Sequence, residues 1–426
     1  MSTENPKAAS QVRVSRPHRS QGEWREFSLE TFVRQDDRVR IVWRYVETLD
    51  VNPLYEKIQA VLGKPGRDAV DPKILLALWL FATIDSVSSA RELARLTERD
   101  LAYMWICGGV SVNYHLLSDF RTQHREFLEK LLTTSVASLL HAGVVTLDTV
   151  AQDGVKVRAN AGSSSFRRKP SLENCVETAK AHVKSVLNSE DTESTPASQA
   201  ARERAAKEKL QRAEEALQQV IELEAEREKR RKGTGDQARC STTDPDARKM
   251  KMGDSGYRPA FNVQLATDGD SRVIVGVKVT NAGNDGEQMA PMQAKIKEQF
   301  GKAPGKYLVD GGFANVEQVT RVEQNGSTVL GPIHGEEGMR KRGKDPHARQ
   351  PRDTDESFAY RERMGTDESK AEYKKRPSIA EYVNAEFRNR GLTQFRVRGL
   401  EKAQAVAVLY ALACNLLRMI HLRAIA

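Results

Sequence analysis

Three acidic residues, far apart in the chain, have neighbours that suit them to bind a divalent cation. Asp153 and Asp310 are each followed at once by glycine, and Glu381 lies in the segment SIAEYVNAEFRNR. Mg²⁺ takes oxygen ligands, and one or two carboxylates with water and phosphate complete its coordination shell. Two such ions about 3.5–4 Å apart can activate an attacking oxygen and stabilise a leaving one. The three acids therefore predict a site for metal-dependent phosphoryl transfer.

The surroundings of Asp310 allow two interpretations. In GKYLVDGGFA, residues 305–314, the aspartate ends an apolar strand and precedes two glycines. Asp and Gly are common turn residues, so Asp310 fits a turn that ends the strand. It equally fits a ligand, because functional side chains are often exposed where strands end. Glycines after Asp153 and Asp310 would also keep side-chain bulk away from a backbone that a nucleic acid must approach closely.

Basic residues accompany Glu381 on its predicted helix. Glu381 and Arg388 are seven residues apart, two helical turns, and so share a face, while Tyr373 and Arg376 come just before the helix. This arrangement suits a metal ligand supported by phosphate contacts. Glu386 is the rival acid, but it lies off that face. The alternative is an ordinary surface Glu and Arg on one helix.

From residue 144 onward the chain alternates between strand and helix patterns. We expect a strand, a turn at Asp153-Gly154 and a second strand, followed by a hairpin at 259–281 with its turn at 268–270. The later elements are a helix near 286–300, a strand at 306–310, a helix near 315–325, a strand at 328–333, a loop to about 353, and helices near 377–388 and 400–424. This order is close to that of a ribonuclease-H-like α/β fold. Such a fold takes acids from the first strand, the end of the fourth strand and a late helix.

Two other regions are predicted to be helical. Residues 171–233 hold two charged stretches with narrow apolar stripes, typical of an antiparallel helical hairpin inserted into the α/β domain. Residues 23–140 look all-helical, with Asp71 as an N-cap before a helix that is apolar all round. A following helix, with Arg91 and Arg95 on its polar face, is compatible with a helix-turn-helix and equally with a plain bundle.

Composition limits the class of protein. The 67 Lys and Arg against 58 Asp and Glu give a net charge of +9, which favours a polyanionic partner. No apolar run approaches the roughly 20 residues of a membrane span, and the polar, basic N-terminus has no signal core, so we expect no membrane association and a cytoplasmic location. The four cysteines are too far apart in sequence for a zinc motif, and we expect them to be reduced.

Several segments together resemble one family. They are DPKILLALWLFATIDSVSSARELARL, VSVNYHLLSDFR, VAQDGVKVRANAG, STTDPDARKMKMGDSGYRPAFNVQLATD, YLVDGGFAN and AEYVNAEFRNRGLTQFRVRGLEKAQAVAVLYALACNLLRMI. The first two are similar to an InsH-type N-terminal domain and the others to a DDE nuclease domain. The chain thus resembles the DDE transposases of bacterial insertion sequences over nearly its whole length.

The resemblance implies a function and a cofactor. It implies that Asp153, Asp310 and Glu381 are the catalytic triad and hold two Mg²⁺ ions, with Mn²⁺ able to substitute. The activity implied is cleavage of double-stranded DNA at the terminal inverted repeats of the element, followed by strand transfer into target DNA. Two alternatives stay open: a structure-specific nuclease without strand transfer, and a catalytically inactive, domesticated DNA-binding protein.

The resemblance also implies a supporting signature and an assembly. Tyr373, Arg376, Glu381 and Arg388 would form the Tyr–Arg–Glu–Lys signature, although four residues here separate Arg376 from Glu381, where the wider superfamily has three, and Arg388 replaces the lysine. Tyr373, Arg376 and Arg388 would support the site or contact phosphate. Both transposon ends must be handled together, which implies a homodimer or a larger synaptic complex, associated with the bacterial nucleoid.

The expected domain organisation follows from these patterns. We expect a disordered basic tail at 1–22 and an InsH-type domain at 23–140 that binds DNA ends, with Arg91 and Arg95 as candidate contacts. A ribonuclease-H-like catalytic domain would comprise 144–170 and 234–424. The charged helical hairpin at 171–233 would be its insertion.

Overall fold

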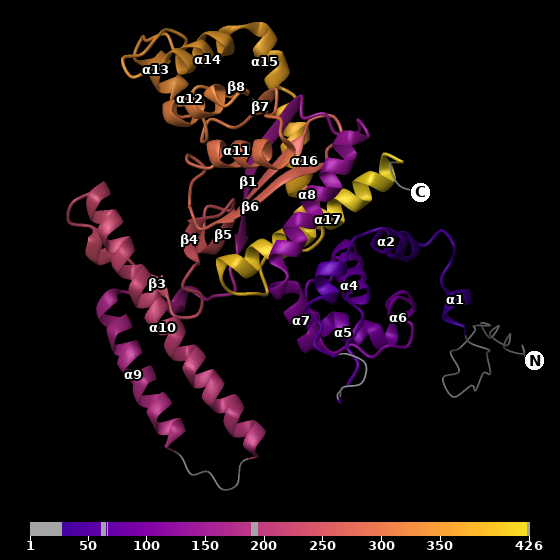
Figure 1. Cartoon of the computed structure of the whole chain (residues 1–426). Coiled ribbons are helices and arrows are strands. Elements are labelled where there is room, and N and C mark those ends of the chain that lie inside the picture. The colour runs from indigo at the N-terminus through magenta and orange to yellow at the C-terminus, as the bar shows by residue number, and fades with distance from the viewer. Residues whose placement is uncertain (1–27, 61–64, 66, 189–194, 424–426) are drawn as a thin grey trace, which may run out of the picture.

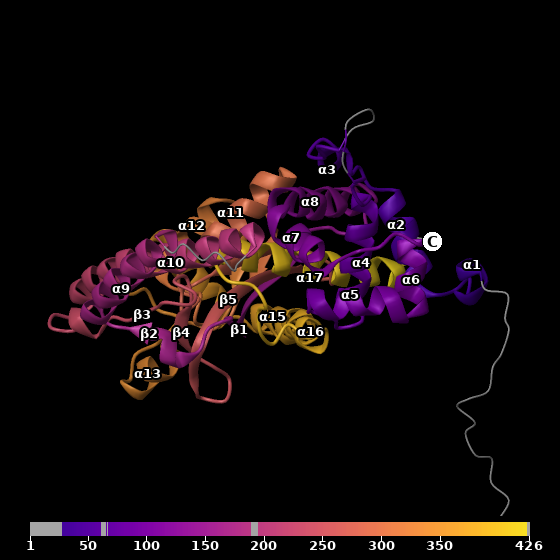
Figure 2. The same cartoon turned by 90° about the horizontal axis from the view of Figure 1, so that it is seen from below.

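The structure is a computed structural model that describes residues 28–60, 65, 67–188 and 195–423. The basic tail predicted at 1–22 lies outside the described residues. A mixed sheet occupies the centre, with the N-terminal helices on one side and a long helical hairpin extending away from the other (Figures 1 and 2).

The N-terminal region is helical, as predicted. Its helices are α1 (Leu29–Phe32), α2 (Arg38–Glu47), α3 (Asn52–Tyr55), α4 (Pro72–Ile84), α5 (Ala90–Arg99), α6 (Leu101–Cys107), α7 (Tyr114–Gln123) and α8 (Arg125–His141). The Asp71 side chain accepts a hydrogen bond from the backbone N–H of Lys73 and caps α4. Every residue of α4 except Lys73 is buried, so it is the central helix of this region.

The sheet combines antiparallel and parallel pairing. Its strands are β1 (Thr149–Arg158), β4 (Arg248–Lys251), β5 (Tyr257–Asp268), β6 (Ile274–Thr280), β7 (Lys306–Leu308) and β8 (Thr328–Leu330). They are hydrogen-bonded in the order β4-β5-β1-β7-β8, and β6 also pairs with β5. β5 is antiparallel to β1 and β6, whereas β7 is parallel to β1 and β8 is parallel to β7. Helices α11 (Met289–Phe300) and α12 (Val316–Gln324) connect β6, β7 and β8, in the predicted element order.

The predicted turn at Asp153-Gly154 is wrong. Both residues lie within the continuous strand β1, where Asp153 pairs with Leu265 and Gly154 with Gln264 of β5. Glycine is needed here for space, since a Cβ on Gly154 would lie 2.5 Å from both Asp285 Oδ1 and Gln264 Nε2. The Asp-Gly pair therefore marks a close approach of side chains to the strand, which a sequence pattern does not distinguish from a turn.

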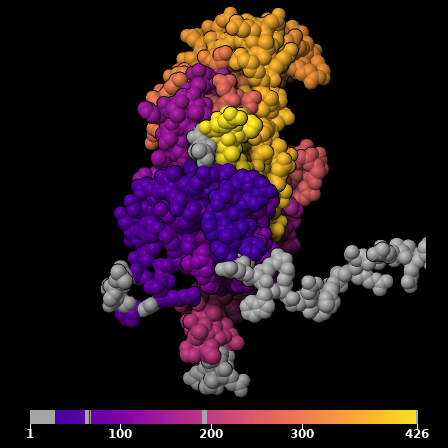
Figure 3. Space-filling view, turned by 90° about the vertical axis from the view of Figure 1, so that its right-hand side faces the viewer, coloured from indigo at the N-terminus to yellow at the C-terminus, as the bar shows by residue number. Residues whose placement is uncertain are grey.

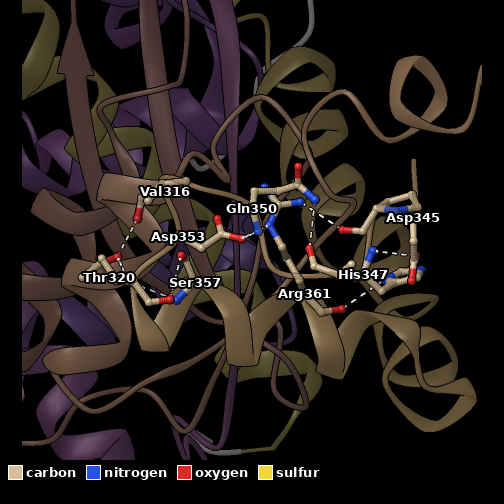
Figure 4. Close-up of polar contacts among 11 residues, drawn as sticks. Val316, Thr320, Asp345, His347, Gln350, Asp353, Ser357 and Arg361 are labelled. Atoms are coloured by element: carbon tan, nitrogen blue, oxygen red, sulfur yellow. Dashed lines mark hydrogen bonds and ion pairs between the residues drawn. The ribbon is translucent and has the colours of Figure 1, made fainter. Parts of the chain in front are cut away.

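The segment after β8 contains more helix than predicted. The expected loop to about 353 includes α13 (Glu336–Lys341), and it is followed by α14 (Asp355–Gly365) and α15 (Asp367–Tyr373). A buried ion pair between Asp353 and Arg361 joins the loop to α14, with Arg361 Nε 2.8 Å from Asp353 Oδ2 (Figure 4). Arg361 Nη1 also donates to the carbonyl of Pro346, and the N–H of Gln350 donates to Asp353. These contacts hold the polar segment against the helices.

The predicted helical hairpin is present as α9 (Lys169–Leu187) and α10 (Pro196–Arg230). The two helices lie side by side and project from the rest of the molecule (Figures 1 and 2). Short strands β2 (Phe166–Arg167) and β3 (Cys240–Ser241) pair antiparallel at its base. A small core there contains Leu172, Val220 and Cys240, while the charged outer faces are exposed.

The last helix joins the two halves of the molecule. Helix α17 (Leu400–His421) packs against β6 on one side and against α4, α7 and α8 on the other, and in Figure 3 the N-terminal helices abut it. Asn415 exchanges two hydrogen bonds with the backbone of Ile274, and Gln404 accepts from the N–H of Val279, so α17 covers the exposed edge of β6. Among the described helices only α17 is long and apolar enough to span a membrane, but 83% of its apolar window is buried inside the protein.

Candidate active site

The pairing of β1 with β7 places two of the predicted acids side by side. These strands are parallel, with Ala151 opposite Leu308 as the last paired residues. Asp153 and Asp310 each lie two residues further along, so they share the same register and the same face of the sheet. β8 supports β7 from the other side, with Leu308 opposite Leu330. The two acids, 157 positions apart in the chain, therefore meet at the end of the parallel strands.

Arg376 lies between these two aspartates. It is the first residue of α16 (Arg376–Asn389) and is buried. Its Nη2 is 3.1 Å from Asp153 Oδ1 and 4.0 Å from Asp310 Oδ2. The Nε atom of Arg376 is buried without a hydrogen-bond partner. The guanidinium thus offsets part of the negative charge of the two acids, from the start of the helix that carries the third predicted acid.

Asp310 combines both interpretations of its sequence context. Its Oδ1 accepts a hydrogen bond of 2.8 Å from the N–H of Gly312 and stabilises the turn after β7. Its Oδ2 faces Arg376 across the site. The side chain is 44% exposed, so it stays accessible to a ligand. One oxygen shapes the turn and the other faces the site.

Asp153 is held more tightly than Asp310. Its Oδ1 accepts from the N–H of Gly154 at 2.9 Å, and its Oδ2 accepts from Nδ2 of Asn384 at 2.8 Å. Burial raises the pKa of the Asp153 carboxyl above its ordinary value, and the Arg376 guanidinium opposes that shift. Donors on both oxygens and a nearby cation fix the orientation of this carboxylate.

A cleft of about 860 Å³ is lined by both Glu381 and Asp153, whereas Asp310 and Arg376 are not among its lining residues. Glu381, Asn384 and Arg388 lie on one face of α16 and line this cleft together with Asp153. The shared face predicted for Glu381 and Arg388 is therefore confirmed. The rival acid Glu386 is absent from the lining and forms an ion pair with Arg390, 2.6 Å between Glu386 Oε2 and Arg390 Nη2.

Two lysines that the sequence patterns did not single out also line this cleft. They are Lys156 on β1 and Lys251 at the end of β4, opposite Arg388 on α16. Beyond Ala151 the strand β1 is no longer paired with β7, and residues 153–156 line the cleft before Arg158 forms a parallel bridge with Gln394. Lys251 comes from a hairpin that only the folded sheet brings near α16. Lys156 follows Asp153 by three residues in the sequence. The alternation of polar and apolar residues alone did not show that its side chain lines the cleft.

The other predicted residues have different settings. Tyr373 ends α15 and is half-buried, next to Arg376; burial raises the pKa of its hydroxyl. Arg91 and Arg95 are exposed on α5, as the predicted polar face requires. The Arg91 guanidinium stacks over the Tyr114 ring, and Arg95 forms an ion pair with Glu92. These two arginines belong to the N-terminal region and do not line the cleft beside Asp153.

The chemistry of the donor set fits a divalent cation, although the acids are not gathered into one cluster. Among the residues that the structure describes, no three His, Cys, Asp or Glu side chains lie close enough to hold a metal ion. The cleft nevertheless offers carboxylates from β1 and α16, and the Oδ1 atom of Asn384 is buried there without a partner. Hard oxygen atoms of this kind are the ligands that Mg²⁺ and Mn²⁺ take.

Comparison with protein families gives two matches. A model described as a transposase domain (DUF772) matches residues 27–123, and one described as a transposase DDE domain matches residues 228–416. Together they cover about two thirds of the chain. Asp310 and Glu381 fall inside the second match, whereas Asp153 lies between the two. No curated protein and no solved structure matched the chain.

Proposed function

Because the chain belongs to the DDE transposases of bacterial insertion sequences, in the group with an InsH-like N-terminal domain, we propose that it moves its own element by cutting and joining DNA. In this proposal it binds the terminal inverted repeats, hydrolyses a phosphodiester at each end and transfers the freed strands to target DNA. Members of this family generally use divalent metal ions. Asp153, Asp310 and Glu381 are the proposed catalytic residues.

One observation carries the proposal: two acids aligned on neighbouring parallel strands share a site with a helix that supplies the third. Asp153 and Asp310 both face Arg376, and Glu381 lines the same cleft as Asp153. We infer that the central sheet is ribonuclease-H-like. The first three main strands, β1, β5 and β6, are antiparallel neighbours, and β7 and β8 follow in parallel on the other side of β1, which supports that assignment.

The residues of the cleft would divide the chemistry between them. Divalent cations held by the three carboxylates would activate the attacking oxygen and stabilise the leaving one. In the first step water forms a bond to phosphorus, and the bond from phosphorus to the 3′ oxygen of the transposon end breaks. In the second step that 3′-hydroxyl attacks a target phosphodiester, and the target's own bond to its 3′ oxygen breaks. No covalent enzyme intermediate is formed.

Cationic side chains of the cleft would bind the DNA backbone. Lys156, Lys251 and Arg388 line the cleft beside Asp153 and Glu381, and their charges favour phosphate. Phosphate binding would also draw Arg376 away from the acids. Recognition of the terminal repeats is assigned to the N-terminal helices, with Arg91 and Arg95 exposed on α5. Synapsis of two ends would require at least a dimer, acting in the cytoplasm at the nucleoid.

The test is cleavage of a labelled duplex that carries the end of the element, with Mg²⁺ or Mn²⁺. Asp153→Asn, Asp310→Asn and Glu381→Gln are each expected to abolish nicking at the repeat boundary while DNA binding persists. Asp148→Asn is the matched control for the aspartates, because Asp148 is exposed and pairs with Lys302. Glu386→Gln tests the rival acid on the same helix.

The outcomes separate the alternatives. Activity in Glu381→Gln but not in Glu386→Gln would show that the wrong acid is assigned on α16. Nicking without joining to a target duplex would indicate a structure-specific nuclease. Binding without nicking by the native chain would indicate an inactive DNA-binding protein.

A further inference from the structure

Asn384 is buried at the point where β1 meets α16. It lies one helical turn beyond Glu381 and is only 5% exposed. Its Nδ2 donates to Asp153 Oδ2 at 2.8 Å, and its backbone carbonyl accepts from Arg388 Nε at 3.2 Å. Arg376, at the start of the same helix, lies 3.1 Å from the other oxygen of Asp153. Asn384 therefore connects the strand acid to the cationic end of the helix.

The other end of the Asn384 amide has no protein partner. A carboxylate only accepts hydrogen bonds, so the NH₂ group of the amide must face Asp153. Oδ1 is then directed away from Asp153, and it is buried without a hydrogen bond. A buried polar atom without a partner is costly, by about 1–3 kcal/mol, unless a ligand or water satisfies it. The residue lines the cleft with Asp153 and Glu381, so its unpaired oxygen belongs to a side chain in the wall of that cleft.

The carboxylates alone leave a cation site incomplete on this side of Asp153. No three acidic or imidazole groups cluster within the described residues. On the Asp310 side, the space between the two aspartates is already taken by the Arg376 guanidinium. On the Glu381 side the cleft is lined by Lys156, Lys251 and Arg388, but among the described residues none of them forms an ion pair with Asp153 or Glu381. Asn384 lines the cleft with both acids and adds a neutral oxygen there. Amide oxygens serve as ligands of hard divalent cations in other sites.

We propose that Asn384 is a fourth residue of the site, which orients Asp153 through Nδ2 and offers Oδ1 to a divalent cation held between Asp153 and Glu381. This rests on the proposed function, since that function brings the cation to the cleft. The cation site on this side is then built from one residue of β1 and two residues of α16. Its first cation binds without any movement of Arg376, whereas a cation between Asp153 and Asp310 requires Arg376 to leave.

The test measures Mn²⁺ binding to the full-length protein, by the loss of the free-ion electron paramagnetic resonance signal, with and without an end duplex. Asn384→Ala is expected to raise the Mn²⁺ dissociation constant at least tenfold, the usual effect of removing a group that orients a ligand. Asn384→Asp is expected to lower it several-fold, because a third carboxylate then replaces the neutral amide. Asn389→Ala is the matched control: Asn389 lines the same cleft from the same helix but is exposed.

A thermal unfolding series separates ligation from packing. In EDTA, Asn384→Asp is expected to melt at a lower temperature than the native chain, because two carboxylates then face each other, and Mn²⁺ is expected to reverse that loss. Equal dissociation constants for the native chain, Asn384→Ala and Asn384→Asp would overturn the proposal. Equal weakening in both variants would do the same, since it would assign the effect to Nδ2 alone.

The failure of this inference is distinguishable from failure of the proposed function. If the native chain binds Mn²⁺ and cuts the end duplex, but the Asn384 variants bind Mn²⁺ as it does, only the role of Asn384 is overturned. If the native chain binds no Mn²⁺ with or without DNA, both the role of Asn384 and the proposed metal-dependent cleavage are overturned.

Discussion

The guanidinium of Arg376 forms an ion pair with Asp153, with Nη2 3.1 Å from Oδ1, in the position where the two strand acids face each other. Arg376 was expected to support the site or contact phosphate. In the structure it is buried against the carboxylates of the site. Two carboxylates this close repel each other when both are ionised, and an arginine between them offsets that repulsion. The same position makes the arginine a competitor for any cation that Asp153 and Asp310 would share.

Replacing Arg376 by glutamine should have opposite effects on stability and on cation binding. Loss of the ion pair leaves Asp153 partly buried without its cation, so we expect the free energy of unfolding in EDTA to fall by about 3 kcal/mol. Mn²⁺ should bind the DNA-free variant more tightly than the native chain, because no side chain competes for the acids. Denaturant unfolding and Mn²⁺ titration would measure both.

Arg340→Gln is the control for this pair of measurements. Arg340 is exposed on α13, pairs with Glu336 of the same helix and does not line the cleft beside Asp153. It should change neither the stability in EDTA nor the Mn²⁺ affinity by much. Weaker Mn²⁺ binding in Arg376→Gln than in the native chain would show that Arg376 does not compete with the cation.

Lys251→Ala should weaken DNA binding through the loss of one phosphate contact. A plot of the logarithm of the binding constant against the logarithm of the salt concentration has a negative slope. If Lys251 neutralises one phosphate, the magnitude of that slope should fall by about 0.9 in the variant. A fluorescence anisotropy titration of an end duplex at several salt concentrations measures this slope. Lys302→Ala, which removes an exposed lysine paired with Asp148, should leave it unchanged. A slope that is the same in Lys251→Ala and the native chain would exclude this contact.

Arg361→Ala should be one of the most destabilising changes outside the cleft. It leaves Asp353, only 1% exposed, as an unpaired buried charge, for which we expect a loss of about 3–5 kcal/mol. The control is Arg349→Ala, since Arg349 pairs with Asp355 at the surface and should contribute about 0–1 kcal/mol. Urea unfolding of the two variants compares a buried and an exposed pair in the same segment. Similar losses would contradict the role assigned to burial.

Asp244 should make stability depend on pH. Burial raises the pKa of its carboxyl to about 6, although it accepts a hydrogen bond from the N–H of Gly399 just before α17. The folded state then holds the proton more tightly than the unfolded state. The tighter binding of this proton stabilises the folded state fully at pH values below the ordinary aspartate pKa. That stabilisation is lost as the pH rises through about 6, where the folded state also releases the proton. We expect the loss to be on the order of 3 kcal/mol.

Asp244→Asn should flatten this part of the stability curve and raise stability at neutral pH relative to the native chain. Urea unfolding between about pH 4 and 8 would show it. Asp270→Asn, at an exposed position in the β5–β6 turn, should keep the native pH dependence. A native curve that does not fall through this range would contradict the shifted pKa.

Local sequence patterns predicted most helices and strands because the relevant signals act within a few residues. The Asp71 cap, the continuous apolar run of α4 and the narrow apolar stripes of α9 and α10 each depend on neighbours one or two turns away. The pattern misassigned Asp153-Gly154, because its glycine is required by side chains from β5 and the loop after β6. Helices α13 to α15 were missed, since buried pairs such as Asp353–Arg361 stabilise a polar segment that has little apolar period.

The sequence by itself determined which acids could serve as metal ligands and which family the chain resembles. It could do so because carboxylates, glycines and helical spacing are properties of short segments. Only the tertiary structure decided how they are arranged. The register of β1 and β7 aligns Asp153 with Asp310, and the packing of α16 on the sheet inserts Arg376 between them and sets Asn384 against Asp153. These contacts join residues more than 60 positions apart, and no local pattern encodes such distances.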